Sequence, residues 1–164
     1  MSEYQIIGPM IRKAENKNIN DVLRLLVQVN DVHAEVRPDL FIKGHTKYTA
    51  TELEDIFADP ATPVFVDVNE EGRVLGYCFC VLQDNTSSYH LQQIRTLYID
   101  DLCIDETARG KGVGRRLYEH AKEYARMQGC HNLTLNVWDG NETAMGFYRR
   151  MALVTQKTTL ETIL

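Results

Sequence analysis

Residues 109–116, Arg-Gly-Lys-Gly-Val-Gly-Arg-Arg, combine basic side chains with three glycines and contain no acid. They follow a segment typical of a strand and precede one typical of an amphipathic helix. Free backbone amides and the helix dipole make such a helix start an anion site, and glycines let a bulky phosphate approach the backbone. Arg115 and Arg116 fall in the first helical turn, where positive charge opposes the dipole. A bound polyphosphate would offset this conflict, so the segment is predicted to bind phosphate.

The order of residues in this loop does not fit two common phosphate motifs. A Walker A loop requires Ser or Thr after Gly-Lys, but Gly112 follows Lys111. The dinucleotide pattern requires a third glycine where Arg115 stands. Two alternatives stay open at this stage: a nucleotide-binding module that uses the same loop, and a plain turn with solvated arginines.

Two motifs together resemble the GNAT family of acetyltransferases. Arg109-x-x-Gly112-x-Gly114 is similar to the family signature Gln/Arg-x-x-Gly-x-Gly/Ala, which wraps the pyrophosphate of CoA. As in the family, it directly follows a strand-like segment. A later segment, Asn141-x-x-Ala144-x-x-Phe147-Tyr148, resembles the family's second motif. The residues after that segment, Met-Ala-Leu, depart from the usual Leu-Gly-Phe. The resemblance implies acetyl-CoA as donor and direct transfer of the acetyl group to an amine.

The resemblance also implies which residues bind the cofactor. The strand before the glycine loop holds the pantetheine arm through its backbone, and one of its N–H groups polarises the thioester carbonyl. Tyr148 lies seven residues after Asn141, which is two helical turns and roughly 10.5 Å. Asn141 is predicted to cap this helix, and Tyr148 is the predicted general acid for the CoA thiolate. The predicted cofactor-binding residues are Leu102, Cys103, Ile104, Arg109, Gly110, Lys111, Gly112, Val113, Gly114, Arg115, Asn141, Ala144, Phe147 and Tyr148.

The base that deprotonates the amine is harder to assign from the sequence. Asp100 and Asp101 lie near the expected acetyl group, and strand alternation predicts that they face opposite sides of the sheet. Because an unpaired buried charge is costly, one of them is expected to meet the substrate cavity as base or as anchor for a cationic amine. Water or a remote acid stays an alternative. His33 and Glu35 are predicted to belong to the acceptor wall, which the family forms in this region.

The elements that must position these residues alternate in type. Strands are predicted at 10–14, 64–68, 74–82, up to 104, 133–138 and 153–160. Helices are predicted from Asn20 to about His33, from Thr51 to Phe57, from the glycine loop to about Met127, and over 142–150. This order predicts a single domain over residues 1–164. Its fold class is α/β (α+β by some schemes), a GNAT-like mixed, mostly antiparallel central sheet flanked by helices on both faces.

Composition narrows the function classes. A net charge of −5 disfavours a general nucleic-acid binder, and no apolar run is long enough to span a membrane. Residues 1–8 lack the pattern of a signal peptide, and the four cysteines follow no zinc-site or disulfide spacing, so no metal is predicted. Reduced core thiols indicate a cytoplasmic protein.

The expected partner is a small-molecule or peptide amine. The sequence leaves open the identity of this amine, the use of longer acyl-CoAs and the presence of a homodimer. Cys103 is a conceivable acyl carrier, although its match to the CoA strand favours a structural role. A CoA-binding regulatory module that has lost turnover is the non-enzymatic alternative.

Overall fold

The computed structural model describes residues 10–86 and 88–164, so the prediction about residues 1–8 lies outside the described residues. Five strands form one sheet in the order β1-β2-β3-β4-β5. The strands are β1 (Met10–Lys13), β2 (Val64–Val68), β3 (Val74–Asp84), β4 (Arg95–Ile104) and β5 (Asn132–Leu135). The α-helices are α1 (Ile19–Val36), α2 (Ala50–Ala58), α3 (Val113–Met127) and α4 (Glu142–Arg150), and short 3-10 turns cover Asn16–Asn18 and Glu106–Ala108.

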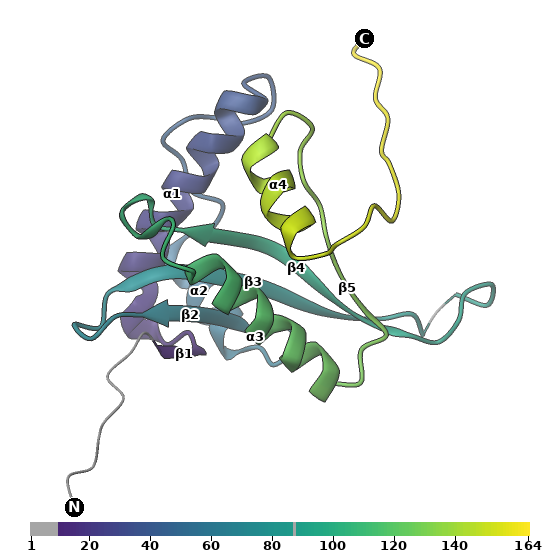
Figure 1. Cartoon of the computed structure of the whole chain (residues 1–164), viewed down its shortest axis with the longest axis horizontal. Coiled ribbons are helices and arrows are strands. Elements are labelled where there is room, and N and C mark those ends of the chain that lie inside the picture. The colour runs from purple at the N-terminus through teal and green to yellow at the C-terminus, as the bar shows by residue number, and fades with distance from the viewer. Residues whose placement is uncertain (1–9, 87) are drawn as a thin grey trace, which may run out of the picture.

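The sheet is mixed and mostly antiparallel, as predicted. Neighbouring strands from β1 to β4 pair antiparallel, and β5 pairs parallel with β4. The chain reaches β5 through α3, because a parallel neighbour requires a crossover connection. Helices cover both faces of the sheet, with α3 and α4 on the face nearer the viewer in Figure 1 and α1 on the other.

Two apolar cores hold the layers together. On one face, Leu25 and Leu26 of α1 and Leu53 of α2 pack on inward-facing residues of β2 and β3. On the other, Val113 and Leu117 of α3 pack on the opposite side of the same strands. All residues of β2 are buried because both of its sides meet a core. Among the described residues, no helix is both long and apolar enough to cross a membrane.

The predicted strand at 153–160 is wrong. Residues 153–164 have no regular secondary structure and run away from the sheet (Figure 1). The chain leaves α4 through a turn in which Ala152 adopts a positive φ of 65°, and none of the described strands pairs with the segment that follows. The strand predicted at 133–138 ends at Leu135 instead. Thr49, not Thr51, caps α2, through a reciprocal capping box with Glu52.

Candidate functional site

The candidate site begins where β4 and β5 separate. Parallel pairing covers only Thr96 to Ile99 on β4 and Asn132 to Leu135 on β5, whereas β4 itself continues to Ile104. Residues 100–104 therefore have no strand partner on their β5 side within the described chain. Figure 1 shows the two strands diverging beneath α4. Backbone donors and acceptors on this edge of β4 are free to bind an extended ligand.

A β-bulge lies at the point of separation. Phe79 pairs with Asp101 and Cys80 with Ile99, so Asp100 is the extra residue on β4. Ile99 packs in the core under α3, whereas Cys103 packs in the core under α1. Simple alternation would put Ile99 and Cys103 on the same face of the sheet, because they are four residues apart. The bulge at Asp100 puts them on opposite faces.

The bulge brings both aspartates to one face, so the prediction that they face opposite sides is wrong. Asp100 Oδ2 accepts hydrogen bonds from Lys47 Nζ at 2.7 Å and from the Tyr48 hydroxyl at 3.1 Å. Asp101 Oδ2 accepts one from the Tyr77 hydroxyl at 2.6 Å. The ring of Phe79 contacts a tyrosine partner of each aspartate, because it stacks on Tyr48 and meets Tyr77 edge-on.

The two acids differ in their hydrogen-bond partners and in the charge beside them. The side chain of Asp100 is 21% exposed and pairs with the half-exposed Lys47. Burial raises the pKa of Asp101 to about 6, and the hydrogen bond from Tyr77 partly opposes this rise. A carboxyl group with a pKa near 6 can accept a proton at neutral pH with more driving force than an ordinary aspartate. Lys47, Tyr48 and Tyr77 were not identified from the sequence, because only the cross-strand register and the loop after α1 bring them here.

The glycine loop lies at the other end of the free edge. Gly110 and Gly112 have φ values of 76° and 78°, a conformation that favours glycine. Arg109, Lys111 and Arg115 are exposed, so their side chains are accessible to an anion. A Cβ on Gly114 would lie 3.1 Å from Ile104 and 3.3 Å from Phe147, so this glycine permits close packing of α3, β4 and α4.

Arg116 is partly exposed, and its guanidinium bonds both the glycine loop and β2. Its guanidinium donates to the fully buried Asp67 at 3.0 and 2.8 Å and to the carbonyl of Lys111 at 3.0 Å. The sequence-based idea that Arg116 belongs to a phosphate cluster is therefore incomplete, because its charge is already paired.

A second network fixes the entry to the loop. Asp105 directly follows β4, is 1% exposed, and accepts hydrogen bonds from Arg24 at 2.6 Å and Arg73 at 3.1 Å. Its pKa lies well below the usual range because Thr107 N–H and both arginines donate to the carboxylate, although burial opposes this. Sequence reasoning missed this group, since its members are far apart in the chain.

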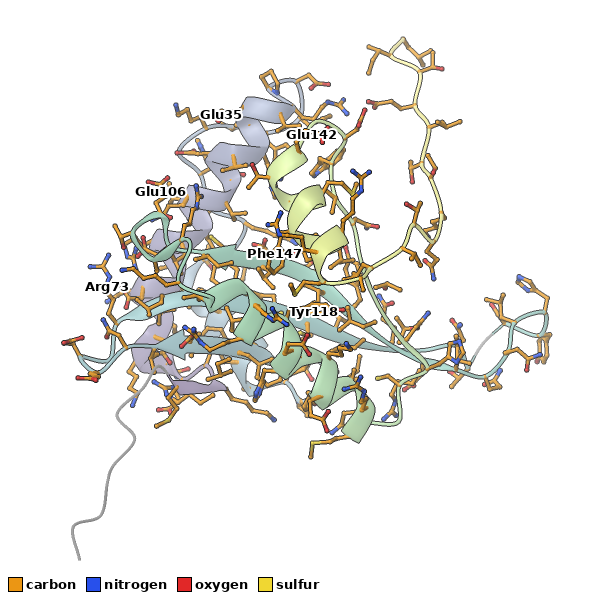
Figure 2. All side chains as sticks on the ribbon, in the orientation of Figure 1. Glu35, Arg73, Glu106, Tyr118, Glu142 and Phe147 are labelled. Atoms are coloured by element: carbon orange, nitrogen blue, oxygen red, sulfur yellow. The ribbon has the colours of Figure 1, made fainter. Side chains whose placement is uncertain are left out.

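Helix α4 brings the remaining motif residues to the separated strands. Asn141 Oδ1 accepts the backbone N–H of Ala144 at 3.1 Å, which confirms the predicted cap. Figure 2 shows Phe147 of α4 and Tyr118 of α3 between the two helices. Tyr148 is half-buried beside Phe147, with ring centroids 5.1 Å apart. Burial, with smaller contributions from Cys78 and Asp101, raises the pKa of Tyr148, so its phenol stays protonated at neutral pH.

The predicted acceptor residues have different surroundings. His33 packs against Phe41 with ring centroids 5.0 Å apart, and Phe41 meets Trp138 edge-on at 5.6 Å. Burial lowers the pKa of His33, and the positive charge of Lys47 lowers it further. Glu35 is exposed at the upper end of α1 in Figure 2. The structure thus brings His33, but not Glu35, into the aromatic group.

Cys103 is badly placed to carry an acyl group. Its side chain is buried in the core under α1, where the thiol lies 3.5 Å from the Leu25 carbonyl. Burial raises the pKa of this thiol to about 12, so little thiolate is present at neutral pH. All four cysteines are free, and no group of three metal-binding side chains occurs among the described residues.

Comparisons with known proteins agree with this geometry. Residues 11–152 match the model of the Acetyltransferase (GNAT) family. A peptidyl-lysine N-acetyltransferase from Escherichia coli is 38% identical over 103 residues, which is 62% of this chain and 57% of that protein. A thialysine N-epsilon-acetyltransferase from Bos taurus is 27% identical over 87% of this chain and 82% of its own length. In the crystal structure of a mutant BH1408 protein from Bacillus halodurans, the fold superposes with a TM-score of 0.90 at 31% identity, over 94% of this chain and 99% of that one.

Proposed function

Because this chain belongs to the GNAT acetyltransferase family, we propose that it transfers an acetyl group from acetyl-CoA directly to a primary amine of a small molecule or peptide. One observation carries the proposal. Pairing of β4 with β5 stops at Ile99, at the bulge, and leaves a free strand edge that ends at an exposed glycine loop. An extended ligand with a polyphosphate at one end and a reactive group at the other fits both features.

The cofactor's parts match the residues along this edge. Backbone amides of residues 109–114 and the start of α3 would bind the pyrophosphate, with Arg109, Lys111 and Arg115 adding positive charge. The free edge of residues 102–104 would bind the pantetheine arm. When bound, acetyl-CoA supplies the activated acyl group, and this chain supplies orientation and proton transfer.

Two side chains are suited to the proton transfers. Tyr148 is protonated and makes no hydrogen bond within the described chain, so its hydroxyl is free to donate to the departing thiolate. Asp101 is suited to receive the proton of the amine, directly or through one water, because its pKa of about 6 lies close to neutral pH. Asp100 is better suited to hold the acceptor's cationic group, because an ammonium group of the acceptor can take the place of its half-exposed partner Lys47.

Aromatic side chains near Asp100 and His33 support the proposed acceptor class. Tyr48 bonds Asp100, and Phe41 packs against both His33 and Trp138. Aromatic faces together with a carboxylate favour an organic cation. The relatives named above are described as acting on a lysine side chain in a peptide and on thialysine, both of which present a primary amine. We propose a cytoplasmic site of action, in keeping with the four free cysteines.

The decisive experiment is a panel of amines with acetyl-CoA, followed by detection of the released thiol. Small polyamines, diamino acids and lysine-containing peptides should be included, and the acetylated product identified by mass. Calorimetry with CoA and ATP should run beside it. Release of thiol that depends on one class of amine supports the enzyme. Binding of CoA without turnover on any amine would favour a regulatory module, and binding of ATP alone would refute the proposal.

A further inference from the structure

Lys47 brings a primary amine of the chain itself to one end of the free edge of β4. Its Nζ donates a hydrogen bond to Asp100 Oδ2 at 2.7 Å. Asp100 is the bulge residue at which β4 and β5 separate, and the glycine loop lies at the opposite end of the same edge. The ammonium group of Lys47 therefore occupies the position that the preceding subsection gives to the ammonium group of an acceptor.

The loop between α1 and α2, which carries Lys47, is anchored on both sides of this residue. Before Lys47, Asp31 Oδ1 of α1 accepts the backbone N–H of Gly44 at 2.7 Å. After it, the ring of Tyr48 stacks on the ring of Phe79 with centroids 5.7 Å apart. Because the fold fixes the loop, the amine is already held at the bulge, and little further entropy is lost when it is brought to a bound thioester.

The side chain of Lys47 is also accessible and able to move. It is 50% exposed, and its flexible four-carbon stem lets the amine swing away from the carboxylate of Asp100. Its Nζ lies 5.3 Å from the ring centroid of Tyr48, so an aromatic face lines its path. Lys43, four residues earlier in the same loop, is exposed as well and offers a reference amine of the same kind.

Transfer to this amine requires a base, because an ammonium group is not a nucleophile. Burial lowers the pKa of Lys47, but the hydrogen bond to Asp100 and the negative charge of that residue raise it, and the net change is upward. Asp101, the next residue along β4, is the base proposed above for an external amine. The same carboxylate lies close enough to Lys47 for the positive charge of this lysine to lower its pKa.

We propose that the chain acetylates its own Lys47, with acetyl-CoA as the donor. This inference rests on the proposed function, since it uses the same donor, acid and base. The Nζ of Lys47 attacks the thioester carbonyl, so that a C–N bond forms and the C–S bond breaks. Of the two protons that the ammonium group gives up, one reaches the sulfur of CoA by way of Tyr148 and one reaches solvent by way of Asp101. The product is a neutral amide, so the ion pair with Asp100 is lost.

Peptide mass spectrometry tests the proposal on the full chain, incubated with acetyl-CoA and no amine. Lys47 should gain one acetyl group at least about 100-fold faster than Lys43 in the same sample, because only Lys47 has a positioned acid and base. Tyr148→Phe should slow acetylation of Lys47 by roughly 10²–10⁴. Lys47→Arg keeps a cation for Asp100 and should remain unacetylated in this loop, whereas the matched control Lys43→Arg should behave as wild type.

Dilution and competition test whether the reaction occurs within one molecule and at the proposed position. At saturating acetyl-CoA, the rate constant for acetylation of Lys47 should not change when the protein is diluted. A saturating acceptor amine should slow this acetylation, because both amines use the same position. A rate constant that falls in proportion to protein concentration would overturn the proposal, as would a rate that the amine leaves unchanged.

The release of thiol in the presence of the amine panel separates this inference from the proposed function. Turnover of an amine without acetylation of Lys47 would overturn the inference and leave the proposed function standing. Equal acetylation of Lys43 and Lys47, in the folded chain as in the chain unfolded in urea, would show chemical modification only and would also overturn it. Absence of both thiol release and acetylation would refute the inference and the proposed function together.

Discussion

Substitution of Asp101 by Asn gives a test in which stability and activity depend on the same proton. Burial raises the pKa of this carboxyl group from 3.8 to about 6 in the folded chain. The folded state therefore binds more protons than the unfolded state between about pH 4 and pH 6. Consequently, the free energy of unfolding falls as the pH rises through this window. A shift of about two pH units corresponds to about 3 kcal/mol at neutral pH.

The Asp101→Asn variant keeps the shape of the side chain and an oxygen that can accept the hydrogen bond from Tyr77. It removes the ionisation, so it should be more stable than wild type by up to about 3 kcal/mol at pH 8 and about equal to it at pH 4. Urea unfolding at intervals of one pH unit measures the difference in the free energy of unfolding between wild type and variant. The contributions of the other titrating groups cancel in this difference.

The activity of the Asp101→Asn variant should fall, although its stability rises. If Asp101 receives the amine's proton, the wild-type kcat/KM should rise with pH through about 6, and the variant should lose both this limb and most of its turnover. Tyr77→Phe removes a hydrogen bond that lowers the pKa of Asp101, so the limb and the stability change should both move to higher pH. A stability difference that does not vary with pH would refute the assigned protonation. An Asp101→Asn variant with full activity would refute the role of Asp101 as the base.

Three further outcomes follow from the site. Gly112→Asp should abolish binding of acetyl-CoA in calorimetry while the chain stays folded, because it places a negative charge in the loop; Gly72→Asp, at a similar positive φ in the β2–β3 turn, controls for backbone strain. Tyr148→Phe should bind acetyl-CoA normally but lower kcat by roughly 10²–10⁴, and near wild-type turnover would show that another group protonates the thiolate. Arg116→Ala should destabilise the chain by about 3 kcal/mol in urea unfolding, since it leaves Asp67 buried without its partner, and an unchanged midpoint would argue against that pairing.

The sequence by itself determined the order of elements from β1 to α4, the family and the two motifs. Those features depend on local patterns: the apolar stripes of α1 and α3, the glycines between Arg109 and Gly114, and the spacing from Asn141 to Tyr148. Each is encoded within one or two turns of a helix or one loop. For that reason they could be predicted without knowledge of the neighbours in space.

The tertiary structure decided how the acids are used and which pairs hold the loop. A bulge at Asp100 depends on the register of β3 against β4, so alternation along one strand gave the wrong faces for the two aspartates. Buried pairs such as Arg116 with Asp67 join residues far apart in the chain, and only folding brings them together. The predicted strand at 153–160 failed for a related reason. Strand propensity is local, but a strand forms only where another backbone lies beside it, and none of the described strands pairs with this segment.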